Sequence, residues 1–121
     1  MKLINNQIYF YAEQLSALNI NDIKMPVRIN FFLQKNIQTI VTAAQEIDAA
    51  RINIAREFGT LNEEGTQYNI PTEKLNDAQK ELNDLFNLEQ ELNIHMFKLD
   101  DFDNIELTVQ QLSAIMFMIE E

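Results

Sequence analysis

The chain offers few side chains that could carry out catalysis. Its 121 residues include one histidine, His95, two serines, Ser16 and Ser113, and no cysteine. A Ser-His-Asp triad needs a serine held beside the histidine, and no Gly-x-Ser-x-Gly turn is present to hold one. His95 lies in an apolar stretch, where a packed histidine is expected rather than a catalytic one. We therefore predict that the protein is not an enzyme and uses no cofactor.

Carboxylates are the other groups that could do chemistry, because hard cations prefer clustered acidic oxygens. Asp100, Asp101, Asp103 and Glu106 lie close together near the end of the chain. Counted from Asp101, an EF-hand loop would need a turn glycine that is missing and a glutamate where Leu112 stands. We therefore expect a solvated turn and no metal site.

The charge of the chain excludes some partners. The formal net charge is -10, and residues 61–121 hold fourteen acidic side chains against three lysines, whereas residues 1–60 hold five against six basic ones. Such a field repels phosphates, so we expect no direct binding to nucleic acid and none to anionic membranes. A basic protein partner stays open, as does imitation of a nucleic acid. The alternative is that the acidic residues only keep the protein in solution.

An acidic ridge is the most regular charged pattern. Asp77, Asp84 and Glu91 recur seven residues apart, about 10.5 Å along a helix, and Glu73 and Glu81 lie beside them. A ridge of this kind can imitate a phosphate backbone to a basic protein. It can equally be the solvated back of an amphipathic helix.

The helix that carries this ridge needs a second, longer helix against which its apolar side can pack. Apolar residues at steps of four and three predict one helix with a coiled-coil-like seam over residues 33–58, ended by Gly59 as a left-handed cap. Arg51 occupies a seam position. Its stem can lie on the seam while the guanidinium reaches Asp48 or an acid of the facing helix, such as Asp77 or Glu81, or it can contact a partner.

The remaining first half predicts a shorter helix and a loop. Residues 5–18 form an amphipathic helix behind an Asn cap, and the alternation over residues 23–31 indicates an extended segment. Pro26 could instead lie in the first turn of the long helix, so that boundary stays open. Residues 59–71 form a long loop that could contain a small turn or hairpin.

The second half completes the pattern. A helix capped by Thr72 over residues 72–92 lies antiparallel to the long helix. Residues 93–99 and 105–107 predict two short strands, and a capping box at Thr108 begins a final short helix. The fold class is therefore mainly α, with α+β left open: a long helical hairpin, two shorter helices and a small β-hairpin near the C-terminus. We predict a single domain over residues 1–121.

Aromatic residues exceed what one small core must use, which predicts an exposed patch for a partner. The residues in question are Tyr9, Phe10, Phe31, Phe32, Phe97 and Phe102.

Four segments carry a resemblance to a known family. They are Met-Pro-Val-Arg-Ile-Asn-Phe-Phe-Leu-Gln-Lys-Asn at 25–36, Ala-Gln-Glu-Ile-Asp at 44–48, Ile-Pro-Thr-Glu-Lys at 70–74 and Ala-Gln-Lys-Glu-Leu-Asn-Asp-Leu at 78–85. Together with the ending at 105–108 and 114–121, they resemble small uncharacterised proteins of tailed phages and prophages of low-GC Gram-positive bacteria. The resemblance implies a phage-encoded, non-enzymatic accessory protein of the late tail and lysis neighbourhood, acting in the host cytoplasm or on the virion.

Two functions follow as hypotheses. The first is a protein-interaction factor in tail or baseplate assembly. The second is an anti-host-defence inhibitor that occupies the basic nucleic-acid channel of a nuclease such as a CRISPR effector. A second copy of the chain is a third candidate partner, beside a phage component and a host nuclease, because the seam can close within one chain or between two. The candidate partner-binding residues are Glu73, Asp77, Glu81, Asp84, Glu91, Asp100, Asp101, Asp103 and Arg51.

Overall fold

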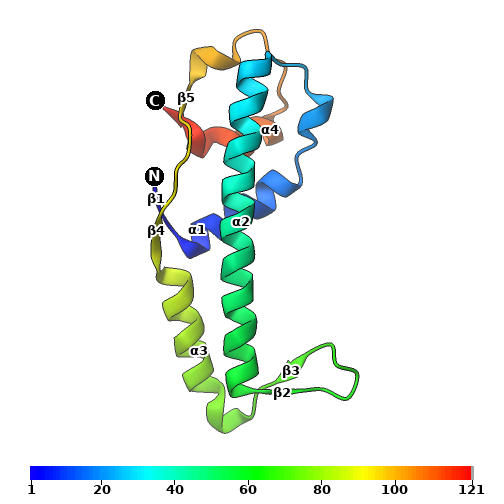
Figure 1. The fold of residues 1–121 in the computed structure, drawn as a ribbon, viewed down its shortest axis with the longest axis vertical. Coiled ribbons are helices and arrows are strands. Elements are labelled where there is room, and N and C mark those ends of the chain that lie inside the picture. Colours follow the sequence, from blue (N-terminus) through cyan, green and yellow to red (C-terminus); the bar gives the residue numbers. More distant parts are fainter. Residues whose placement is uncertain (121) are drawn as a thin grey trace.

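One long helix organises the fold. The computed structural model describes residues 1–120, and α2 (Val27–Phe58) runs through almost the whole length of the molecule (Figure 1). Its 32 residues span about 48 Å at a rise of about 1.5 Å per residue. α1 (Asn5–Ser16) crosses α2 near its middle, and α3 (Thr72–Asn87) lies along its C-terminal half.

The remaining elements are short. α4 (Val109–Ile115) packs against α1, and three one-turn 3-10 helices cover Ile20–Asp22, Leu99–Phe102 and Met116–Met118. The strands are β1 (Lys2–Ile4), β2 (Thr60–Leu61), β3 (Tyr68–Asn69), β4 (Glu89–Glu91), β5 (Phe97–Lys98) and β6 (Ile119–Glu120). The predicted fold class is confirmed: the described residues are mainly helical, with a helical hairpin of α2 and α3, two shorter helices and short strands near the C-terminus.

The extended segment predicted for residues 23–31 is wrong beyond Pro26. Pro26 has extended backbone angles and accepts the first helical bond, from the Asn30 N–H at 3.0 Å, so α2 begins at Val27. Only Ile29 of the alternating apolar residues is buried, whereas Val27 and Phe31 are exposed. The alternation therefore reflected exposed side chains rather than a strand, and the helical seam begins at Ile29.

The helix predicted for residues 72–92 ends earlier, at Asn87. Leu88 is extended, and β4 then pairs antiparallel with β1 in the register Lys2↔Glu91. Asn5 stabilises this end of α3, because its buried amide donates to the Leu85 carbonyl at 2.8 Å and its N–H donates to the Leu88 carbonyl at 2.8 Å. Tertiary pairing with the N-terminal segment therefore stops a helix that periodicity alone would continue.

The predicted caps need correction. Asn5 is the first residue of α1 and is committed to α3, while Ile4 occupies the cap position. Thr72 is likewise inside α3, which follows the extended Pro71. Thr108 does cap α4 as predicted, accepting the Gln111 N–H at 3.1 Å.

The 59–71 loop contains the hairpin that its sequence allowed as an alternative to a flexible tip: β2 pairs antiparallel with β3 and projects from the end of α2 (Figure 1). Gly59 is not a left-handed cap, because its φ is -125°. Glycine is needed here because there is no space for a side chain: a Cβ at this position would lie 2.9 Å from the Ala55 and Asn69 carbonyl oxygens. Gly65, with φ +73°, supplies the left-handed position of the hairpin turn.

The strands near the C-terminus pair differently from the expected hairpin. β5 pairs in parallel with β6 in the register Phe97↔Ile119, and residues 105–107 form no strand. Residues 99–104 turn as predicted, with Asn104 at φ 66°. The two strands are too far apart in sequence for a hairpin, and α4 lies between them.

The core lies in one half of the molecule. Its buried side chains come from α1, α4, the 94–102 segment and the part of α2 that ends at Ile47, with Leu3, Ile20, Met118 and Ile119 added from short elements. Beyond that point α2 and α3 extend as a two-helix arm, defined here as residues 48–86. In the arm only Ala78 is buried. The molecule thus has a packed body and an arm of two helices whose apolar side chains are partly exposed to solvent.

Candidate functional site

The predicted acidic residues do not form one surface. Four of them, Glu73, Asp77, Glu81 and Asp84, are exposed on α3. Glu91 lies on β4 instead, so the predicted ridge does not continue to it, and its carboxylate pairs with the N-terminal amine at 2.9 Å. That interaction supports the β1–β4 pair.

The other three acidic candidates lie in the body. Asp100, Asp101 and Asp103 occupy the turn that follows β5. Asp101 accepts the Lys98 N–H at 2.9 Å, so it stabilises the turn in which it lies. Among the described residues, no three His, Cys, Asp or Glu side chains gather closely enough to hold a metal ion.

Arg51 has the structural contact that was predicted. Its guanidinium bonds Asp48 Oδ1 at 2.9 to 3.0 Å, and the same oxygen accepts the Tyr9 hydroxyl at 2.9 Å. The partner is thus on its own helix; within residues 1–120, no ion pair joins Arg51 to Asp77 or Glu81. The three groups connect α1 to the beginning of the arm.

This triad shifts the pKa of all three of its members, and that of Arg51 is raised chiefly by its hydrogen bond to Asp48. The hydrogen bond from Tyr9, followed by that from Arg51, lowers the pKa of Asp48 below its ordinary value. The hydrogen bond to Asp48, with burial next, raises the pKa of Tyr9 above its ordinary value. The Tyr9 ring also packs edge-on against Phe86 of α3 at 5.6 Å, so one tyrosine contacts both helices of the hairpin.

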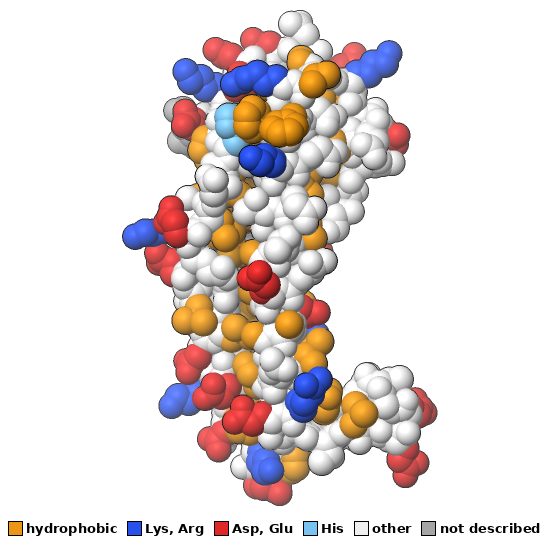
Figure 2. Space-filling model, viewed as in Figure 1, with side chains coloured by type: hydrophobic (Ala, Val, Ile, Leu, Met, Phe, Trp, Pro, Cys, Tyr) orange, Lys and Arg blue, Asp and Glu red, His pale blue; other side chains and the backbone are white. Residues whose placement is uncertain are grey.

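The arm carries an uncovered apolar stripe. Leu75 is 50% exposed and Ile52 is 37% exposed, while Leu82, Ile54 and Phe58 are only half-buried. Two helices alone cannot enclose such a stripe, because each leaves its partner open on both flanks. Figure 2 shows apolar side chains along the seam of this region, between acidic and basic ones.

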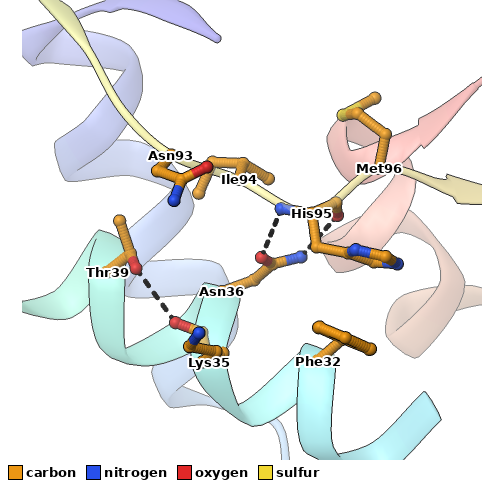
Figure 3. A pocket seen from close by; sticks show the side chains of 8 residues that line it. All are labelled: Phe32, Lys35, Asn36, Thr39, Asn93, Ile94, His95 and Met96. Atoms are coloured by element: carbon orange, nitrogen blue, oxygen red, sulfur yellow. Dashed lines mark hydrogen bonds between the residues drawn. The ribbon is translucent and has the colours of Figure 1, made fainter. Parts of the chain in front are cut away.

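His95 is a packed histidine. Its ring stacks on Phe32 with centroids 4.0 Å apart and meets Phe97 edge-on at 4.9 Å. The backbone N–H and carbonyl of His95 bond the buried amide of Asn36, both at 2.8 Å. This pair of bonds holds the 93–96 segment against α2 (Figure 3).

A hollow of about 390 Å³ opens beside this stack. In Figure 3 the Asn93 and Thr39 side chains lie on one side of it and the His95–Phe32 stack on the other. Lys35 also lines it, and none of the described residues that line it is acidic. A hollow lined by a lysine and by no acidic side chain is unusual in a chain whose net charge is -10.

Cations and aromatic rings continue from the hollow along α2, in what we term the aromatic–cation patch: Phe32, Lys35 and His95, which line the hollow, and Arg28 and Phe31, which contact them. Arg28 lies over Phe32 at 5.8 Å and Lys35 over Phe31 at 5.9 Å. Phe31 is 57% exposed. Figure 2 shows the histidine beside apolar rings with basic side chains around them.

Sequence reasoning missed the patch as a unit. It identified Phe31 and Phe32 as candidates for an exposed aromatic site, whereas Phe97 and Phe102, from the same set, are buried in the core. The missing signal is the spacing of Arg28, Phe31, Phe32 and Lys35, which brings them to one side of a helix only if the helix begins before residue 28.

Comparison with known proteins finds no match: neither a family model, nor a curated protein, nor a solved structure is similar to this chain. The part of the chain that the structure describes has no helix with the length and hydropathy to cross a membrane. What the fold and its surfaces define is a small helical protein with two chemically distinct surfaces, the arm and the patch.

Proposed function

We propose that this protein is a non-enzymatic protein-interaction factor that binds a protein partner through the apolar stripe of its arm. By the resemblance of its sequence, we propose further that it is phage-encoded, acts in the host cytoplasm or on the virion, and is accessory to tail or baseplate assembly. The observation that carries the interaction proposal is the arm itself, in which one side chain, Ala78, is buried among the 39 described residues of 48–86.

The energetics of the stripe support a partner. Complete burial of a leucine or isoleucine side chain contributes about 1.5–3 kcal/mol. Leu75 and Ile52 of the stripe, and Leu61 of β2 beside the end of α2, are between 37% and 53% exposed, so a partner that covered all three would gain roughly 3 kcal/mol from them before the entropy of association is subtracted. Such a surface favours a partner with its own apolar helix or strand.

An anti-host-defence inhibitor is the second candidate function, favoured by the four exposed carboxylates of α3. The charge density of the helix argues against it. Lys74 and Lys80 reduce the charge of α3 to -2 over 16 residues, which is one net charge per about 12 Å. Duplex DNA carries one per about 1.7 Å. We therefore favour the assembly proposal.

The experiment that tests the proposal is an affinity pull-down of the tagged chain from phage-infected cells, washed at low and at high salt. A tail or baseplate protein that stays bound in high salt is expected, because apolar contacts are insensitive to screening. A host nuclease that elutes with salt would replace the assembly proposal by the inhibitor.

Matched variants make the test specific to the arm. Leu75→Lys places a charge on the stripe and is expected to abolish the salt-resistant partner. Val109→Lys makes the same kind of change at a residue of α4 that is 84% exposed, and it should leave binding intact. Equal binding by both variants would refute the role of the arm. Light scattering of the purified chain tests whether the partner is a second copy.

A further inference from the structure

The aromatic–cation patch, at the other end of α2 from the arm, is chemically unusual for this molecule. The chain has 19 acidic residues, yet among residues 1–120 neither Arg28 nor Lys35 forms an ion pair with any of them. Both cations lie instead over phenylalanine rings. A cation over a ring keeps its charge available to a second group on its far side.

The scaffold under the patch is held in place. Asn36 is 1% exposed, and its side-chain amide bonds the backbone N–H and carbonyl of His95. The ring of His95 in turn stacks on Phe32, with ring centroids 4.0 Å apart. Phe31 stands edge-on to Phe32 at 5.3 Å and is more than half exposed. The patch therefore presents an apolar ring between two cations in a preformed arrangement, which reduces the entropy cost of binding.

The spacing of the cations suits a peptide. Arg28 and Lys35 are seven residues apart on α2, about 10.5 Å of helix rise. Side chains of an extended strand alternate between its two faces, so residues i, i+2 and i+4 point the same way, and i to i+4 spans about 13 Å at about 3.3 Å each. The long side chains of Arg28 and Lys35 can reach across the small difference from about 10.5 Å. An extended segment can therefore place one carboxylate on each cation and an apolar side chain between them, on Phe31.

We propose that the aromatic–cation patch binds an acidic segment of a protein partner, with carboxylates on Arg28 and Lys35 and an apolar side chain on Phe31. The hollow beside Lys35, lined also by Asn93 and His95, accommodates a further side chain of the segment. The site is separate from the apolar stripe of the arm and does not depend on the function proposed for it.

A nucleic acid fits the patch less well. A single strand carries a phosphate at every nucleotide and would meet the net charge of -10 along its length, including the acidic turn of Asp100, Asp101 and Asp103 in the same body. A short acidic segment needs only the local cations, since charges beyond about 8 Å are screened at physiological salt.

His95 supplies the measurement. It is the one histidine of the chain, so its ring proton gives a single assignable NMR signal inside the patch. The probe is a short synthetic peptide with Asp, Leu and Glu at every second position, separated by serines, so that an extended chain presents them on one face; it is added to the full chain. A saturable shift of the His95 signal that weakens with salt is expected. The double variant R28E/K35E is expected to weaken binding by at least about tenfold.

Controls separate the proposal from its alternatives. The double variant K74E/K80E makes the same change of four charge units on the exposed arm, and it should leave the peptide affinity unchanged; the milder Lys35→Gln guards against a folding defect in R28E/K35E. The proposal is overturned by the absence of a saturable shift, or by equal affinity of the double variant. A larger shift with oligothymidylate, or a shift on concentrating the free chain, would overturn it in favour of nucleic acid or a second copy.

Discussion

The change of Asn36 to leucine tests how the 93–96 segment is held. Asn36 is the central polar residue of the body: its Nδ2 donates to the His95 carbonyl at 2.8 Å and to Met118 Sδ at 3.3 Å, and its Oδ1 accepts the His95 N–H at 2.8 Å. Leucine has a similar volume and fills the site. It also leaves both backbone groups of His95 without their partner.

The expected cost follows from these two groups. A partly buried backbone group that loses its partner costs about 1–3 kcal/mol. Two such groups would cost about 2–6 kcal/mol, and the neighbouring hollow admits water that moves the value toward the lower end, about 2–4 kcal/mol. For a chain of this size this corresponds to a fall in Tm of about 8–16 °C.

Urea denaturation followed by circular dichroism measures the loss, with the Tm as a second readout. Asn93→Ala is the matched control, because Asn93 is exposed on the same segment and its change should stay within about 0.5 kcal/mol. If Asn36→Leu unfolds within about 1 kcal/mol of the unaltered chain, the argument that the amide holds this segment is refuted.

Four further predictions concern the arm and its contact with Tyr9. Gly59→Ala is expected to destabilise the protein by about 1–3 kcal/mol, measured by urea denaturation, because the new Cβ would lie 2.9 Å from two backbone carbonyl oxygens; an unchanged midpoint would contradict this. Asp48→Asn is expected to bring the pKa of Tyr9 down toward its ordinary value of 10.0, seen as an earlier rise of tyrosinate absorbance, which the absence of tryptophan makes easy to follow. In the unaltered chain, the lowered pKa of Asp48 stabilises the fold above pH 3.8, and this contribution is lost as the pH falls through the pKa of Asp48 in the folded protein. The raised pKa of Tyr9 stabilises the fold below pH 10.0, and this contribution is lost as the pH rises through the pKa of Tyr9 in the folded protein. Arg51→Met should lower the free energy of unfolding by less than about 1 kcal/mol and keep partner binding; an unchanged Tm together with lost binding would mean that Arg51 contacts the partner.

Periodicity predicted the long elements well. The four-three steps identified α2, and the antiparallel α3 followed from a second apolar stripe and the loop between them. Asp48 was one of the contacts that the sequence allowed for Arg51, beside Asp77, Glu81 or a partner, and it is the one that the structure shows. These features depend on local spacing, which the sequence states directly.

Features that depend on contacts distant in sequence were missed. The end of α3 is decided by Asn5, 80 residues away from the Leu85 carbonyl that it binds, and no local pattern announces that bond. The parallel pairing of β5 with β6 is of the same kind. Asn36 is different: a seam begun at Ile29 would have placed it in the core.

The patch was missed for a related reason. An extended reading of residues 23–31 puts Arg28 and Phe31 on opposite faces, whereas a helix puts them on one. A single boundary, at Pro26, therefore decided whether a binding surface could be recognised. The acidic ridge was overestimated for the converse reason, since a helix assumed to reach Glu91 ends at Asn87.

The unbroken course of α2 through both body and arm makes the molecule a ruler. From Phe31 to Ile52 there are 21 residues of one helix, or about 32 Å. Two molecules that contact these positions would be kept at a constant separation and a constant angle about the helix axis. Two inserted residues in α2 would turn one end by about 200° relative to the other, whereas seven would lengthen the spacing by about 10.5 Å with little rotation. If partners bind at both positions, such a helix would set the distance between them as well as join them.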